Sequence, residues 1–275
     1  MQKNYPRVVA VIPARNESKF LGSTLEALNK QILKPNKVIV VNDGSKDDTH
    51  DIAVKHKASV IDIQDRGFRA TGLPVLAEVI NKGLGDIQEN ECEYILILGA
   101  DHILTPEYID TIVEIMEKNK RIAIASGVIK GESQREKAPR GSGRIVRYDF
   151  WKKIGLRYPT WFGFESYIVF KALADSYEVC VVRDLVSMSQ RPTGKDTDYK
   201  SYGKAMRALG YHPLYALGRS ALAFTKTPKG ALWMFLGYCN SGIKKYDVAQ
   251  FVCKYQTIEI RKKIGVLINR LVKKN

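Results

Sequence analysis

Acidic side chains that follow apolar runs are the first residues in this sequence that can do chemistry. Asp101 follows the run Tyr94 to Leu98, where a carboxylate costs desolvation energy unless a cation meets it. Asp43 follows another apolar run and can accept two hydrogen bonds from a nucleobase or a ribose. A simpler interpretation of the Asp43 region is a turn and a helix N-cap, with Asp47 or Asp48 before the helix.

Polar residues also gather after the two apolar runs nearest the N-terminus. Residues 11–17 read Val-Ile-Pro-Ala-Arg-Asn-Glu, and residues 41–49 read Val-Asn-Asp-Gly-Ser-Lys-Asp-Asp-Thr. As parallel strands, the two runs would bring these motifs to the carboxyl edge of a sheet, where open α/β sheets bind ligands. The residues that we expect to bind a ligand at this edge are Pro13, Ala14, Arg15, Glu17, Asp43 and Ser45.

The elements that must position these residues alternate along the first half of the chain. β-Branched runs are separated by segments with apolar residues at helical spacing, which indicates an α/β fold with a mostly parallel sheet flanked by helices. The expected strands are Arg7–Ile12, Lys37–Val41, Ser59–Ile63, Tyr94–Leu98 and Ile122–Ile129. The expected helices are Phe20–Gln31, Asp48–His56, Pro74–Gly85 and Pro106–Lys118.

The pattern changes after Gly131. Residues 132–147 are polar, and we expect a loop followed by a strand. A helix, a strand and a polar loop should complete this part, over Phe164–Asp175, Tyr177–Val182 and Ser187–Asp198. The rest of the chain is expected to be helical, with breaks at His212–Pro213, Thr227–Pro228 and Ser241–Gly242. It ends in a basic helix over Val248–Lys274. We therefore expect a catalytic domain over residues 1–195 and a basic helical region over 196–275.

Several of these motifs together resemble those of family-2 glycosyltransferases, in the order of the fold. They are Ile-Pro-Ala-Arg-Asn-Glu at 12–17, Val-Asn-Asp-Gly-Ser at 41–45, Leu-Ala-Glu-Val-Ile-Asn-Lys-Gly at 76–83, Tyr-Ile-Leu-Ile-Leu-Gly-Ala-Asp at 94–101, Gly-Phe-Glu-Ser at 163–166 and Gln-Arg-Pro-Thr-Gly at 190–194. Residues 210–215 and 236–238 also resemble bacterial and archaeal members that build cell-surface glycans. The resemblance implies a GT-A (Rossmann-like) fold and inverting transfer of a sugar from a nucleotide-diphosphate donor to a hydroxyl of a lipid-linked or cell-surface glycan.

The family usually has Asp-x-Asp where this sequence has Gly99-Ala100-Asp101. The resemblance implies that Ala100 and Asp101 contact the nucleotide sugar. It also implies that Asp101 is a ligand of Mg²⁺ or Mn²⁺, hard cations that suit carboxylate and diphosphate oxygens. His102 is either a helper at this metal site or a solvated loop residue.

Glu165 stands in the position of a Glu-Asp pair, with Ser166 in place of the usual Asp. In an inverting transfer a carboxylate must take the proton of the attacking hydroxyl, so the resemblance implies that Glu165 is the catalytic base. Glu165 could instead orient the acceptor while another group takes the proton. A purely structural role would be a first-turn Glu that favours the helix dipole.

Cations stand in two loops that can reach a nucleotide. Arg191 and Lys195 can stabilise the charge of the diphosphate leaving group, unless their segment is only a surface loop. Arg66 or Arg69 follows the third strand and can contact the base or the phosphates, and we select Arg69. The segment 140–144 could contact the acceptor or the pyrophosphate.

Charge is concentrated at one end of the chain. Residues 1–190 carry 27 Lys and Arg against 25 Asp and Glu, whereas residues 191–275 carry 17 against 4. Amphipathic helices with aromatic and basic residues can lie on an anionic membrane, or they can pack on the catalytic domain with solvated cations. A nucleic-acid partner would rest on this charge alone and is not expected.

Further exclusions set the class and the compartment. Four scattered cysteines give neither a disulfide framework nor a zinc site, which favours a reducing compartment. The longest run without Asp, Glu, Lys or Arg, Gly230–Ile243, has 14 residues and is shorter than the roughly 20 of a membrane-spanning helix. No secretory signal is expected, because residues 8–13 run directly into Arg15 and Glu17. We expect a cytoplasmic enzyme, peripheral on the cytoplasmic face of the membrane. The rival is a catalytically degenerate sugar-nucleotide or glycan binding protein.

Overall fold

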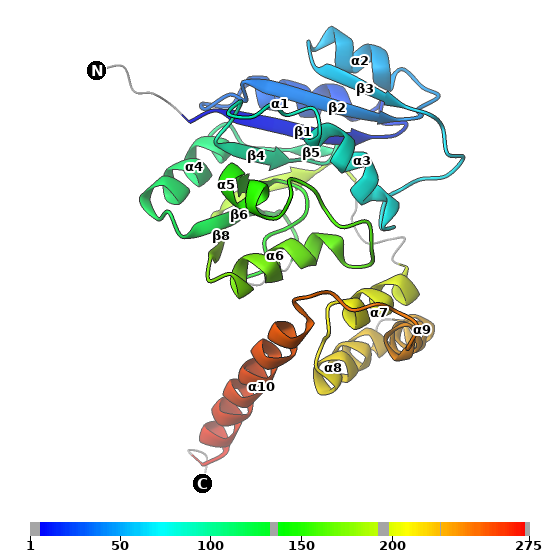
Figure 1. The fold of residues 1–275 in the computed structure, drawn as a ribbon, viewed down its shortest axis with the longest axis vertical. Coiled ribbons are helices and arrows are strands. Elements are labelled where there is room, and N and C mark those ends of the chain that lie inside the picture. The colour runs from blue at the N-terminus through cyan, green and yellow to red at the C-terminus, as the bar shows by residue number, and fades with distance from the viewer. Residues whose placement is uncertain (1–5, 133–136, 192–197, 226, 273–275) are drawn as a thin grey trace. The chain divides into compact units, whose positions relative to one another are not determined.

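The computed structural model describes residues 6–132, 137–191, 198–225 and 227–272 (Figure 1). The chain divides into two units. The first unit comprises residues 1–160 and 175–195, and the second comprises residues 161–174 and 196–275. The helix that carries Glu165 therefore belongs to the second unit.

Within its described residues, the first unit contains a sheet of eight strands in the order β3-β2-β1-β4-β7-β6-β8-β5. The strands are β1 (Val8–Ala14), β2 (Lys37–Asp43), β3 (Ser59–Ile63), β4 (Tyr94–Ile97), β5 (His102–Ile103), β6 (Ile122–Ile129), β7 (Arg144–Arg147) and β8 (Glu178–Ser189). Only β7 and β5 run against the other strands. The predicted mostly parallel α/β sheet is thus confirmed.

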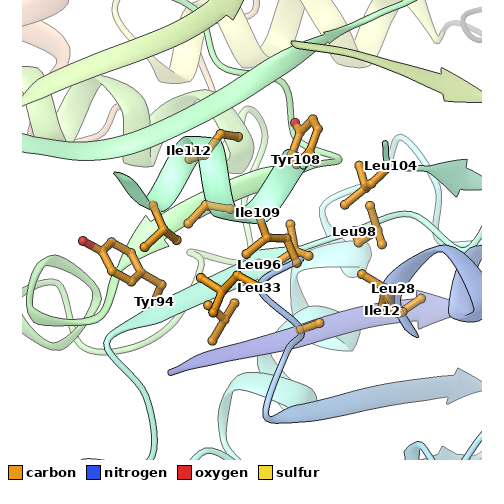
Figure 2. Close-up of a cluster of buried hydrophobic side chains, with 14 of the residues drawn as sticks. Ile12, Leu28, Leu33, Tyr94, Leu96, Leu98, Leu104, Tyr108, Ile109 and Ile112 are labelled. Atoms are coloured by element: carbon orange, nitrogen blue, oxygen red, sulfur yellow. The ribbon is translucent and has the colours of Figure 1, made fainter. Parts of the chain in front are cut away.

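The alternation of side chains along β1 fixes which helices cover each face of the sheet. Ala10 and Ile12 belong to an apolar core shared with one group of helices. Figure 2 shows Ile12 in this core, where each large buried aliphatic side chain stabilises the fold by about 1.5–3 kcal/mol. Those helices are α1 (Leu21–Asn29), α2 (Thr49–Lys55) and α4 (Tyr108–Lys118). On the opposite face, α3 (Val75–Leu84) comes so close that a Cβ at Gly83 would lie 2.5 Å from a methyl of Val11.

The sequence-based prediction fails in part of the first unit. Residues 187–189, expected in a loop, belong to β8, in which Leu185 and Ser187 are buried while Val186 and Met188 are exposed. That alternation is typical of a strand. The polar Ser187 can be buried because its hydroxyl forms hydrogen bonds with His102 and with the Val128 carbonyl, which are distant in the sequence. The helix α5 (Tyr148–Lys153) was not predicted either, and its Tyr148, Phe150 and Trp151 are buried.

The second unit is helical, as expected. Its described helices are α6 (Phe164–Ala174), α7 (Tyr199–Ala208), α8 (Pro213–Phe224), α9 (Pro228–Cys239) and α10 (Ala249–Val272). The helices α7 to α10 are separated at the three predicted breaks, and α8 and α9 each carry proline in the first turn, where its missing N–H costs nothing. No helix among the described residues is both long enough and apolar enough to cross a bilayer.

Candidate active site

The carboxyl ends of β1, β2 and β4 meet where the strand order reverses. β1 pairs with β2 on one side and with β4 on the other, all three in parallel. The chain leaves β1 at Ala14, β2 at Asp43 and β4 at Ile97, four residues before Asp101. Such a switch point is where open α/β sheets bind ligands, because the loops diverge and leave a crevice.

Asp43 is buried at this edge and is already paired with a cation. Its carboxylate accepts from Arg66, with Nη2 at 2.7 Å and Nε at 2.9 Å, and the residue is 2% exposed. Arg15 donates to the Asp43 carbonyl oxygen and, at 2.5 Å, to the carboxylate of Asp65. The Arg15 guanidinium holds the pKa of Asp65 well below its usual range. Asp43 is therefore a buried carboxylate held by a cation of the chain itself, and its contact with a ligand stays a prediction.

The loops after β1 and β2 are joined by hydrogen bonds. The backbone N–H of Asn16 donates to the Ser45 hydroxyl at 2.9 Å, and that of Glu17 donates to the Thr49 hydroxyl at 2.8 Å. The Asp47 carboxylate accepts from the N–H groups of Ser18 at 3.0 Å and Thr49 at 3.1 Å. Asp47 is thus the residue with the predicted turn role, and Ser45 helps to fix the loop that carries Glu17.

Gly44 allows the loop after β2 to pass the end of β3. Its φ is +64°, which favours glycine, and a Cβ there would overlap the Asp65 backbone. The close approach brings Asp65 within reach of Arg15. A side chain at position 44 would separate these two charges.

Arg191 joins two acids on different loops. Its Nη2 lies 2.5 Å from Glu17 Oε1, and its Nε lies 2.6 Å from Asp101 Oδ2. Arg69 also reaches Glu17 Oε1, at 3.3 Å. Glu17 Oε2 is buried without a hydrogen-bond partner among the described residues. Burial raises the pKa of Glu17, although the hydrogen bond from Arg191 and its charge act to lower it. The cluster therefore holds a buried carboxylate oxygen that can still accept from a donor or a cation.

Gly99, which stands where the family usually has its first Asp, is tightly packed. The N–H of Gly99 donates to the Ser142 hydroxyl at 2.8 Å. A Cβ at position 99 would lie 3.1 Å from that oxygen and 3.2 Å from Asp101 Oδ1, which is tight packing. The carbonyl of Ala100 accepts from Thr24 at 2.8 Å and fixes the same turn. Ser142 and Asp101 thus fill the space next to position 99.

His102 is neither a metal helper nor a solvated residue, and both interpretations were wrong. It is 2% exposed, and its ring lies between the hydroxyls of Ser142 at 2.6 Å and Ser187 at 2.7 Å. Ser187 donates its own proton to the Val128 carbonyl at 3.0 Å, so Nε2–H of His102 donates to Ser187 and Nδ1 accepts from Ser142. Burial lowers the pKa of His102 to about 4, so the ring is neutral at pH 7.

Comparison with known proteins decides the family. Residues 9–187 match the family model described as glycosyl transferase family 2. This chain belongs to glycosyl transferase family 2. A curated relative, the 4,4'-diaponeurosporenoate glycosyltransferase of Staphylococcus aureus, is 42% identical over 62 residues. That segment is 22% of this chain and only 16% of the relative.

Solved structures of similar proteins show the fold of this family-2 member. The mannosyltransferase PcManGT from Pyrobaculum calidifontis, solved with GDP-Man and Mn²⁺, has a TM-score of 0.59 at 15% identity, over 94% of this chain and 81% of its own. TarS 1–349 from S. aureus, solved with UDP, has a TM-score of 0.59 at 14% identity, over 91% and 70%. Glucosyl-3-phosphoglycerate synthase from Mycobacterium tuberculosis has a TM-score of 0.56 at 15% identity, over 74% and 78%. These likenesses confirm the GT-A fold.

Several residues predicted to bind the donor line one small pocket of this family-2 protein. The predicted residues in its wall are Pro13, Ala14, Arg15, Glu17, Asp43 and Arg69. Ala70, Thr71, Leu76 and Val79 complete the lining. Arg191 forms ion pairs with both Glu17 and Asp101, which brings Asp101 to the same edge.

Other predicted residues lie elsewhere. Glu165 is an exposed residue in the first turn of α6, in the second unit, and its catalytic role stays a prediction. Lys195 lies outside the described residues. In the segment 140–144, Arg144 is 2% exposed and donates to the carbonyls of Pro139 and Arg140, at 2.7 and 2.9 Å, so it stabilises the chain's own loop.

Three residues at this edge were missed or passed over. Arg66 and Asp65, which pair with Asp43 and Arg15, follow directly after β3. Arg66 was considered because it follows the third strand, but Arg69 was selected, and the same position after a parallel strand could also have pointed to Asp65. Ser142 has no such signal, because its partners Gly99 and His102 lie about 40 positions earlier.

Proposed function

We propose that this protein transfers a sugar from a nucleoside-diphosphate donor to a hydroxyl of a lipid-linked or cell-surface glycan, with inversion at the anomeric carbon. The observation that carries the proposal is the convergence of Asp43, Glu17, Asp101 and Arg191 at the switch point of the sheet. Membership of glycosyl transferase family 2 supports it. So do the UDP, UDP-GlcNAc and GDP-Man complexes of the structural neighbours.

The nucleoside half of the donor fits the pocket beside β1 and β2. Arg15, Asp43 and Arg69 offer charged groups there, with Pro13 and Ala14 in the wall. The Asp43 carboxylate accepts hydrogen bonds from the ribose hydroxyls or the base, which replace one of its two hydrogen bonds from Arg66. Arg66 is then available to the phosphate side of the donor.

The diphosphate half fits the cluster around Arg191. A diphosphate competes with Glu17 and Asp101 for the Arg191 guanidinium, because phosphate oxygens suit its two-pronged geometry. Lys195 follows on the same segment of the sequence and adds a second cation. These cations stabilise the negative charge that develops on the departing nucleoside diphosphate.

A divalent cation fits beside Asp101. Carboxylate oxygens are the ligands that Mg²⁺ and Mn²⁺ prefer, and Glu17 Oε2 is a buried oxygen that lacks a partner within the described residues. The described part of the chain has no group of three or more His, Cys, Asp or Glu residues placed to hold a metal. Asp101 would therefore share the ion with oxygens of the diphosphate, and the bound ion supplies further charge stabilisation to the leaving group.

Glu165 acts as the base in this proposal. It takes the proton of the acceptor hydroxyl as that oxygen attacks the anomeric carbon and the bond to the diphosphate breaks. Such a carboxylate contributes about 10²–10⁴-fold to the rate. The acceptor keeps the enzyme at the cytoplasmic face of the membrane as a peripheral protein.

The test measures nucleotide release from UDP-, GDP- and dTDP-sugars by the full chain, with Mn²⁺ and an acceptor lipid extract. Glu165→Gln should lower turnover by about 100-fold or more while nucleotide binding persists. Glu259→Gln, on α10 of the same unit, is the matched control and should keep full turnover. Full turnover by Glu165→Gln would remove Glu165 from the mechanism. Nucleotide binding without turnover by the wild type would favour the degenerate binding protein that Gly99 and Ser166 suggest.

A further inference from the structure

One face of α8 is apolar and exposed. Leu214, Leu217 and Leu222 are 62%, 53% and 70% exposed, and Gly218 and Ala221 between them are exposed too. Their spacing of three and four places them on one side of the helix. The small residues Ala216 and Ser220 are the buried ones. This arrangement reverses the usual pattern of a surface helix, whose apolar side is buried.

The next helix, α9, repeats the arrangement. Leu232, Trp233 and Leu236 are 58%, 50% and 47% exposed, whereas Ala231 and Met234 are buried. α9 packs against α8 and α7. We call the exposed residues Leu214, Leu217, Leu222, Leu232, Trp233 and Leu236 the α8–α9 face. An apolar surface of this kind marks a site that another apolar body covers.

The charge around the α8–α9 face is of one sign. Residues 199–246 contain eight Lys and Arg and neither Asp nor Glu. Lys200 lies over the ring of Trp233, with Nζ 5.2 Å from the ring centroid, and Lys229 is exposed at the start of α9. Apolar side chains that lie among cations match the surface of an anionic bilayer, which offers acyl chains below negative headgroups.

We propose that the α8–α9 face docks on an anionic phospholipid bilayer, with its leucines and Trp233 inserted below the headgroups. α8 and α9 have 12 residues each, which is about 18 Å of helix and too short for a bilayer core of about 30 Å. They would therefore lie along the interface. This inference rests on the proposed function only in the sense that a lipid-linked acceptor gives the docking its purpose.

Two other partners fit the face less well. A second copy of the chain would bring two surfaces of the same strong positive charge together, which opposes self-association. Nucleic acid would satisfy the cations but would leave the leucines of α8 in water, since phosphates and base edges offer them little apolar contact. The bilayer satisfies both the charge and the apolar groups.

The test is co-sedimentation of the full-length protein with vesicles, without donor or acceptor. The wild type should bind vesicles of phosphatidylcholine with phosphatidylglycerol, bind phosphatidylcholine alone far more weakly, and lose affinity as salt is added. Leu222→Glu combined with Trp233→Glu should lower the affinity on the order of tenfold or more. Ile32→Glu is the matched control, because Ile32 is 68% exposed but belongs to the first unit.

Three outcomes would overturn the proposal. One is binding by the double variant, folded by circular dichroism, that equals the wild type. Another is wild-type binding that is equally strong to vesicles with and without phosphatidylglycerol. The third is a lipid-free dimer that the double variant abolishes, which would make the face a contact between copies. Nucleotide release from the donor, measured without vesicles, tests the proposed function separately, so either idea can fail alone.

Discussion

At the residue scale, the guanidinium of Arg191 holds together two acids, Glu17 and Asp101, that are 174 and 90 positions away in the sequence. It also lies over the ring of Phe20, at 5.2 Å from the centroid. Arg69 also reaches Glu17. A donor diphosphate that takes Arg191 therefore leaves Asp101 as the acid that loses its ion pair among the described residues. In the proposed function a divalent cation at Asp101 would replace that positive charge, which gives a physical reason for donor and metal to bind together.

His102 makes the stability of the protein depend on pH. Its pKa in the folded chain is about 4 against 6.5 in an unfolded chain, so the unfolded state binds a proton between these values and the folded state does not. The contribution is complete above pH 6.5 and is lost as the pH falls toward 4, by up to about 3 kcal/mol. Asp101 opposes the shift and burial dominates it.

His102→Gln removes this titrating group while keeping a hydrogen-bonding side chain. We expect the wild type to be more stable than the variant at pH 7, and the gap in free energy of unfolding to shrink as the pH falls to about 4.5. Urea unfolding of both proteins across this range measures the gap. A gap that stays constant with pH would show that His102 is not held neutral by the fold.

At the scale of elements, α7 and α9 cross at two glycines. A Cβ at Gly203 of α7 would overlap the carbonyl of Met234, and a Cβ at Gly237 of α9 would overlap the carbonyl of Lys200. The two helix backbones therefore approach more closely than any side chain would allow. The crossing fixes α9 against α7, and α9 in turn packs against α8, the other helix of the α8–α9 face.

Gly203→Ala should destabilise the second unit by about 1–3 kcal/mol, because the crossing must open to admit a methyl group. Gly218→Ala is its control, in α8, where no atom lies within 4 Å of the added carbon. That change should stabilise the protein by about 0.5–1 kcal/mol, since alanine loses less entropy than glycine in a helix. Thermal unfolding of both variants decides the matter, and equal effects from the two would refute the close crossing.

The elements show how far the sequence predicts this fold. The parallel strands and their helices were predictable because each repeats a local pattern, as in Val8–Ala14 and Tyr108–Lys118. The end of β8 was not, because Ser187 reads as a loop residue until His102, 85 positions away, accounts for its burial. The same limit applies to the candidate site. Strand ends located Asp43 and Asp101, whereas the pairing of each with an arginine depends on contacts between distant loops.

At the scale of the whole molecule, two units carry different kinds of surface. The first unit carries 28 Lys and Arg against 24 Asp and Glu and holds the candidate donor site, whereas the second carries 16 against 5. An enzyme whose donor is soluble and whose acceptor stays at a bilayer needs both kinds of surface. Because the candidate donor site and the α8–α9 face belong to different units, donor binding and vesicle binding can be tested as separate properties.

If a nucleoside diphosphate and a divalent cation bind together at Asp101, each should depend on the other, and thermal-shift measurements can detect that dependence. UDP, GDP, dTDP and CMP are each added with and without Mn²⁺ or Mg²⁺ to the wild type, to Asp101→Asn and to the control Asp51→Asn, which changes an exposed acid on α2. A ligand that binds only the folded state raises its stability by about 2.7 kcal/mol at a concentration 100 times its Kd. We predict that one nucleoside diphosphate raises the Tm of the wild type and of Asp51→Asn only when the cation is present, and that Asp101→Asn loses this dependence. No shift with any nucleotide, or the same cation-dependent shift in Asp101→Asn, would show that Asp101 does not bind the cation together with the nucleotide.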